Sequence, residues 1–117
     1  MRSQFYEKFM EIAIEEARKS LKEGNKGFGA VLVKNEKAIA QAHDTEVTDS
    51  DLTAHAEINV IRKASKNYGE DLAGCILFST HEPCPMCTGA LIWAKVSEVV
   101  YGASIRDTVK LRGTMNN

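Results

Sequence analysis

The sequence predicts an α/β fold in which helices cover both faces of a mixed β-sheet. The first observation is a helical periodicity of apolar residues near the N-terminus. The second is a pair of apolar runs on either side of a short polar turn, which is typical of a β-hairpin. The third is the alternation of strands with helices in the second half, which favours right-handed crossovers and parallel pairing. At 117 residues, the chain is expected to form one domain over residues 1–117.

The first half is predicted to contain one long helix and one hairpin. Apolar residues recur every three or four positions over residues 4–23, and Gly24 is expected to end this helix. Residues 28–33 and 38–40 are apolar and flank a polar turn. We therefore expect these two segments to pair as antiparallel strands.

The second half is predicted to alternate between helices and strands. Residues 45–51 are polar and are expected to form a loop, and Thr53 is expected to cap a helix over residues 54–68. Residues 75–79 are almost wholly apolar, which predicts a strand buried on both faces. Pro85 suits the first turn of the next helix, because its fixed φ is helical. The last predicted elements are this helix up to residue 95, a strand over residues 96–101 and a helix over residues 103–111.

Composition and charge limit the classes of function. Apolar residues make up 44% and charged residues 26%, as in an ordinary folded protein. The formal net charge of -1 gives no general attraction to polyanions. The basic cluster of Arg62, Lys63 and Lys66 lacks interleaved aromatic residues, so we interpret it as a solvated helix face and do not expect nucleic-acid binding. No run of about 18 apolar residues and no signal-peptide core is found, which predicts no membrane association and a cytoplasmic location.

Two short motifs contain residues that could bind a metal or take part in catalysis, and each lies at a predicted helix start. His55-x-Glu57 alone is weak, because surface helices often produce it, and Cys84-x-x-Cys87 alone is compatible with a redox pair. Together they offer one imidazole and two thiolates, the three-ligand set of a catalytic zinc site. The helix N-terminus and the zinc are both expected to favour thiolate over thiol. The alternative is a structural zinc site whose fourth ligand would be His43 or His81.

The candidate zinc ligands and the nearby glutamate together predict a hydrolytic reaction. One Zn²⁺ per chain, held by His55, Cys84 and Cys87, would lower the pKa of water toward neutrality, and Glu57 would take the proton. The attack would fall on the amino-bearing carbon of a heteroaromatic ring. Glu57 would then protonate a ring nitrogen and the departing ammonia. The combination of His-x-Glu with Pro-Cys-x-x-Cys is a known signature of zinc deaminases, hydrolases that act on C–N bonds of cyclic amidines.

Several segments resemble the cytidine and deoxycytidylate deaminase superfamily, in the branch of bacterial guanine deaminases, cytosine deaminases and tRNA adenosine deaminases. They are Thr53-Ala54-His55-Ala56-Glu57-Ile58 and Glu82-Pro83-Cys84-Pro85-Met86-Cys87. Residues 27–31 and 89–94 look closest to the guanine deaminase type. The resemblance covers residues 5–108 and implies the three-layer α/β/α cytidine deaminase-like fold with strand order 2-1-3-4-5.

The resemblance also implies contacts with a substrate. Phe28 would border the base pocket, and the backbone N–H groups of Ala56 and Cys84 would contact the substrate. Asp107 matches an aspartate near the substrate amino group, although a carboxylate in a first helical turn is also favoured by the helix dipole alone. Relatives in this branch are commonly dimers, so a homodimer or higher homo-oligomer is expected.

The sequence departs from the family pattern in three places. Asp44 stands where the family usually has an asparagine that hydrogen-bonds the base, and an aspartate cannot donate unless it is protonated. Leu52 replaces a proline, which is expected to loosen the pocket wall. The last strand and helix of the relatives are expected to be missing or shortened, because residues 112–117 carry no apolar pattern.

Three functions remain as hypotheses. The leading one is zinc-dependent deamination of a free nucleobase or small nucleoside, with guanine or cytosine as the first candidates. The second is deamination of adenosine in tRNA. The third is a catalytically silent, zinc-stabilised interaction domain, which Asp44 and the short C-terminal segment motivate.

Overall fold

The computed structural model describes residues 2–104, and their elements follow the predicted order. The elements are α1 (Arg2–Lys22), β1 (Gly29–Lys34), β2 (Lys37–His43), α2 (Ala56–Tyr68), β3 (Ile76–His81), α3 (Pro85–Trp93) and β4 (Glu98–Ala103). Within the described residues, no helix combines the length and the apolar character needed to span a bilayer.

The strands form one mixed sheet with the order β2-β1-β3-β4. Strand β1 pairs antiparallel with both β2 and β3, whereas β3 and β4 are parallel. The predicted hairpin and the predicted parallel pairing in the second half are both confirmed. The order agrees with the implied 2-1-3-4-5 as far as β4, and residues 2–104 contain no fifth strand.

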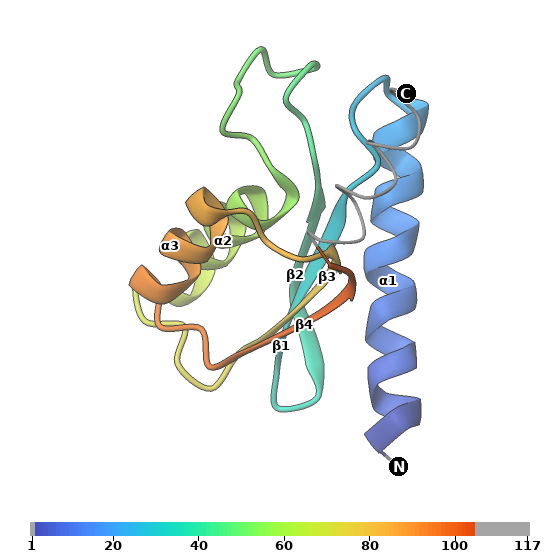
Figure 1. The fold of residues 1–117 in the computed structure, drawn as a ribbon. Helices are drawn as coiled ribbons and strands as arrows, with labels where there is room; N and C mark the ends of the chain where they lie inside the picture. Colours follow the sequence, from blue (N-terminus) through green and yellow to red (C-terminus); the bar gives the residue numbers. More distant parts are fainter. Residues whose placement is uncertain (1, 105–117) are drawn as a thin grey trace.

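Two helical layers enclose this sheet (Figure 1). Helix α1 covers one face, and α2 and α3 lie together on the other. Side chains alternate along β1, so Ala30 and Leu32 belong to the core under α2 and α3, while Val31 and Val33 pack with Phe9 of α1. Because each face of β1 is covered, the strand is apolar and buried from Gly29 to Val33, and only Lys34 at its end is charged. The predicted α/β/α fold is confirmed.

Each observed element differs from the predicted one by one to three residues at one end or both, and two of these differences change an interpretation. The N-cap of α2 is His55, not Thr53. The backbone N–H and the hydroxyl of Thr53 both donate to the Asp51 carboxylate, so Thr53 completes a turn before the helix. Strand β4 extends to Ala103, which means that no helix begins at that residue. Residues 105–111 of the predicted last helix lie outside the described part of the chain.

Candidate active site

The site is built where α2 and α3 begin. His55 is the N-cap of α2, and Cys84 is the N-cap of α3. Pro85 occupies the first turn of α3, as predicted, where its missing N–H leaves no hydrogen bond unmade. Cys87 lies one turn further along α3 and is fully buried. Two helix starts that are distant in the sequence therefore bring three metal-binding side chains together.

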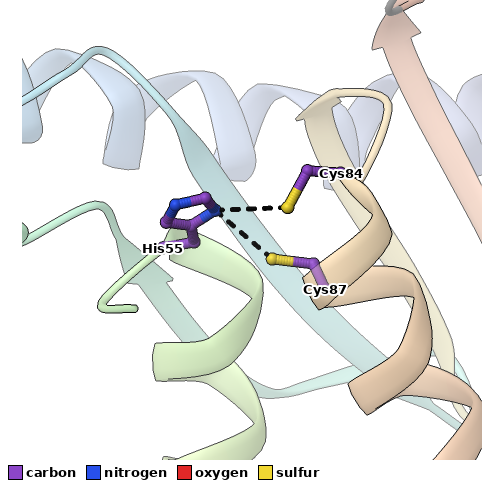
Figure 2. A group of neighbouring side chains, drawn as sticks. All are labelled: His55, Cys84 and Cys87. Carbon is purple, nitrogen blue, oxygen red and sulfur yellow. Dashed lines mark hydrogen bonds between the residues drawn. The ribbon is translucent and has the colours of Figure 1, made fainter. Parts of the chain in front are cut away.

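The donor atoms have the spacing of one tetrahedral zinc site. His55 Nδ1 lies 3.6 Å from Cys84 Sγ and 3.5 Å from Cys87 Sγ (Figure 2). Zinc–nitrogen bonds of about 2.05 Å and zinc–sulfur bonds of about 2.3 Å at tetrahedral angles place nitrogen and sulfur about 3.6 Å apart. The donor set therefore fits a zinc ion in both chemistry and dimensions.

Neither proposed fourth ligand joins this cluster within residues 2–104. Both ring nitrogens of His43 contact carboxylates instead, at 2.7 Å from Glu16 and 2.8 Å from Glu23. The His81 ring packs edge-on against Phe28, with centroids 4.5 Å apart. The described residues thus leave the fourth coordination position without a protein ligand.

A cavity of about 240 Å³ lies beside the candidate metal ligands. Its walls are Lys26, Phe28, Glu46, His55, Glu57, Ser79, His81, Glu82 and Cys84. Pockets for drug-sized ligands measure roughly 300–1,000 Å³, so this one suits a smaller molecule such as a single ring system. Phe28, a predicted substrate contact, lines this cavity.

Glu57, the predicted proton carrier, faces the same cavity from the first turn of α2. Its side chain is buried, and this burial raises the pKa of the carboxyl above its ordinary value. Burial, together with the neighbouring Glu57 and Cys84, also raises the pKa of the Cys87 thiol. Burial thus opposes the Cys87 thiolate, which the helix N-terminus and zinc together are expected to favour. A cation beside the sulfur is needed to favour the thiolate.

Asp44 is fully buried and is not among the residues that line the cavity. Its Oδ1 accepts a hydrogen bond of 3.0 Å from the Glu46 backbone N–H, and its carbonyl accepts one of 2.9 Å from Ser20 Oγ. Burial and the hydrogen bond to Glu46 raise the pKa of Asp44 to about 6. The same hydrogen bond lowers the pKa of Glu46. Asp44 therefore takes up a proton before Glu46 does as the pH falls. A role for Asp44 in reading the base stays a prediction.

Glu46 is one of several cavity-lining residues, with Lys26, Ser79 and Glu82, that the sequence pattern does not indicate. Its Oε1 lies 3.7 Å from His55 Nε2, and its Oε2 lies 3.5 Å from Lys26 Nζ. The surrounding loop is fixed by Asn25, whose side-chain oxygen accepts 3.0 Å hydrogen bonds from the N–H groups of Val47 and Thr48. A polar loop has no periodicity, so the sequence pattern gave no signal for this contact.

The other predicted substrate contacts have different outcomes. Ala56 is fully buried as the first residue of α2, next to the site, but its predicted backbone contact stays a prediction. Asp107 lies outside the described residues. In the basic cluster, Arg62 bonds to Asp51 and Thr53, and Lys63 donates to the carbonyl of Gln41. These local contacts agree with the interpretation of the cluster as a solvated face.

Comparisons with known proteins agree with this geometry. A family model described as the cytidine and deoxycytidylate deaminase zinc-binding region matches residues 3–103. The guanine deaminase of Bacillus subtilis (strain 168) is 42% identical over 107 residues, which cover 90% of this chain and 69% of that protein. The tRNA-specific adenosine deaminase of the same strain is 46% identical over 98 residues, which cover 83% of this chain and 61% of that protein.

A solved structure shows the same likeness in three dimensions. The X-ray structure of guanine deaminase from Bacillus subtilis has a TM-score of 0.85 and 41% identity, and the match covers 90% of this chain and 68% of that one. The chain therefore spans between 61% and 69% of the lengths of these relatives.

Proposed function

The chain belongs to the cytidine and deoxycytidylate deaminase family, and from this premise we propose that it is a zinc-dependent hydrolytic deaminase of a nucleobase or small nucleoside. The main support is that His55, Cys84 and Cys87 converge with the spacing of zinc ligands. They do so at the edge of a cavity that Glu57 also lines.

Each site residue has a separate task in this proposal. His55, Cys84 and Cys87 would hold the ion, which supplies a Lewis acid that lowers the pKa of water. Glu57 takes a proton from the attacking water and gives it to a ring nitrogen. It then takes the remaining proton from the added hydroxyl group and gives it to the amino group that leaves as ammonia. Water and the amine are thereby converted into a carbonyl group and ammonia, with no net gain or loss of protons by Glu57. Phe28 offers an apolar wall for a flat ring.

Guanine and cytosine are the leading substrates. A guanine deaminase is among the relatives with the highest identity and structural similarity, and a cavity of about 240 Å³ suits a free base. The cavity wall also carries Glu46 and Glu82. Carboxylates accept hydrogen bonds from ring N–H and amino groups, which these bases possess.

Deamination of adenosine in tRNA is the second candidate, because a tRNA-specific adenosine deaminase is 46% identical. Binding to RNA should weaken steeply as salt rises, since phosphate contacts release counterions. The local hydrogen bonds of Arg62 and Lys63 disfavour this alternative. Binding that is weak and insensitive to salt would remove it.

Self-association is part of the proposal. Ile92 and Trp93 on α3 are 72% and 89% exposed, which is unusual for large apolar side chains. A homodimer or higher homo-oligomer would cover this surface. Sedimentation velocity over a range of protein concentrations measures the assembly state directly.

The decisive experiment measures ammonia release from guanine, cytosine, cytidine, deoxycytidylate and adenosine. Glu57→Gln should retain zinc but lose turnover by about 10²–10⁴-fold, because the substitution removes the proton carrier. Glu15→Gln is a matched control, since Glu15 is an exposed helical carboxylate paired with Arg18 at 3.0 Å. If the zinc-loaded wild type releases no ammonia from any of these substrates, a silent zinc-stabilised domain is favoured instead.

A further inference from the structure

We infer that Glu46 is a positioning residue for the metal centre, whose carboxylate fixes the His55 ring so that Nδ1 faces the two cysteine sulfurs. This inference rests on the zinc site of the proposed function. It assigns a task to a residue from the loop between β2 and α2, outside both sequence motifs.

The two ring nitrogens of His55 face different partners. Nδ1 lies 3.5–3.6 Å from the sulfurs, and Figure 2 shows the second ring nitrogen on the side away from them. That nitrogen, Nε2, lies 3.7 Å from Glu46 Oε1. A nitrogen that binds a metal carries no proton, so the proton of the neutral ring must reside on Nε2. The N–H of that nitrogen therefore has a carboxylate as its neighbour.

A carboxylate beside a metal-binding histidine, as Glu46 is beside His55, has a known function in proteins. A ligand histidine almost always donates its other N–H to a carboxylate, a carbonyl or water, which sets the tautomer and raises the basicity of the coordinating nitrogen. At 3.7 Å, the separation of Glu46 Oε1 and His55 Nε2 is about 0.5 Å beyond the upper limit of a normal hydrogen bond. The inferred hydrogen bond therefore requires a small rotation of one of these side chains.

The protein holds Glu46 in place for this contact. Its side chain is only 8% exposed, and Lys26 Nζ lies 3.5 Å from its other carboxylate oxygen. Its backbone N–H donates to the buried Asp44, and the next residue, Val47, donates to Asn25. A carboxylate held on a fixed loop loses little entropy when it orients the ring, unlike a mobile surface side chain.

The charge of the Glu46 carboxylate also has a nearby partner. Lys26 Nζ lies 3.5 Å from Glu46 Oε2 and offsets part of this negative charge. The two cysteine thiolates would in turn neutralise one Zn²⁺, so the carboxylate would not have to balance the ion alone.

The test compares zinc affinity in wild type, Glu46→Ala and Glu46→Gln by competition with a chromophoric chelator, without substrate. Glu46→Ala should weaken zinc binding by about 10–100-fold, and Glu46→Gln by less, because the amide oxygen still accepts a hydrogen bond. Glu23→Gln is the matched control, since Glu23 contacts a histidine nitrogen at 2.8 Å but that histidine is not a ligand. The absorption bands of the Co²⁺-substituted protein should shift in the two Glu46 variants and not in the control.

Two outcomes would overturn the inference. One is a zinc affinity within about two-fold of wild type in both Glu46 variants, since a lost outer-shell partner should cost much more. The other is a second zinc ion per wild-type chain that disappears in both variants, which would make Asp44, Glu46 and His55 a cation site of their own. Should Glu46→Ala fail to fold by circular dichroism, the nearly isosteric Glu46→Gln decides the test. Because affinity is measured without turnover, absent ammonia release would count against the deaminase proposal alone.

Discussion

Gly29 is the position where a single methyl group should disturb the fold most. An ideal Cβ at Gly29 would lie 2.0 Å from the carbonyl oxygen of Ala13, 2.5 Å from the backbone nitrogen of Ala17 and 2.9 Å from Glu16 Cβ. Ordinary van der Waals contact begins near 3.4 Å, so the shortest contact is too close by 1.4 Å. Strand β1 therefore approaches the backbone of α1 at a distance that only glycine permits.

The cost of Gly29→Ala follows from the kind of atoms that are in the way. Helix backbone cannot rotate aside as a flexible side chain can, so the whole of α1 would have to retreat from the sheet. We expect a loss of about 3 kcal/mol in the free energy of unfolding, the upper part of the usual range for overpacking. At about 4 °C per kcal/mol for a domain of this size, the melting temperature should fall by roughly 12 °C.

Thermal and urea denaturation followed by circular dichroism measure this loss. Gly89→Ala is the matched control, because no heavy atom lies within 4 Å of its added Cβ and it occupies an exposed position in α3. That variant should be as stable as wild type or more stable by about 0.5–1 kcal/mol. A melting temperature for Gly29→Ala within about 2 °C of wild type would refute the reasoning, since overpacking against helix backbone should cost far more.

Three further predictions concern the metal and the charged residues. Zinc at 100 times its dissociation constant should stabilise the protein by about 2.7 kcal/mol, so a chelator should lower the melting temperature, and an unchanged curve after verified zinc loss would contradict this. Cys87→Ala should abolish zinc binding and turnover. Cys75→Ala should keep both, because Cys75 is buried just before β3 and is not among the candidate ligands. Zinc analysis of the purified variants tests this. Burial opposes the charged form of His43, but hydrogen bonds to Glu16 and Glu23 raise its pKa above 6.5. The resulting stabilisation is present below the ordinary pKa of histidine and is lost as pH rises through the folded-state pKa. His43→Gln should therefore lower the free energy of unfolding, measured by urea denaturation, by about 1 kcal/mol at pH 5.5 and by less at pH 8.5. Equal losses at the two pH values would count against the ion pairs.

The sequence could predict those parts of the molecule that depend on local periodicity or on residue type and spacing. Alternating strands and helices fixed the layers, and the two cysteines at a helix start indicated where the sulfurs gather. The position of Glu46 depends on tertiary hydrogen bonds from Asn25 to the loop, which no local pattern reports. The start of α2 was misplaced for a related reason, since the Thr53 hydroxyl bonds back to Asp51 and is not available as a cap.

The apolar cores on the two faces of the sheet are separate, and the candidate metal ligands belong only to the layer formed by α2 and α3. An ion bound by residues of both helices would link α2 to α3 and stabilise that layer, without affecting the packing of α1. Amide hydrogens at the starts of α2 and α3 should then exchange faster after zinc removal, while those of α1 keep their rates. Loss of the ion would then loosen the packing of α2 and α3 and leave the contacts of α1 with the sheet unchanged.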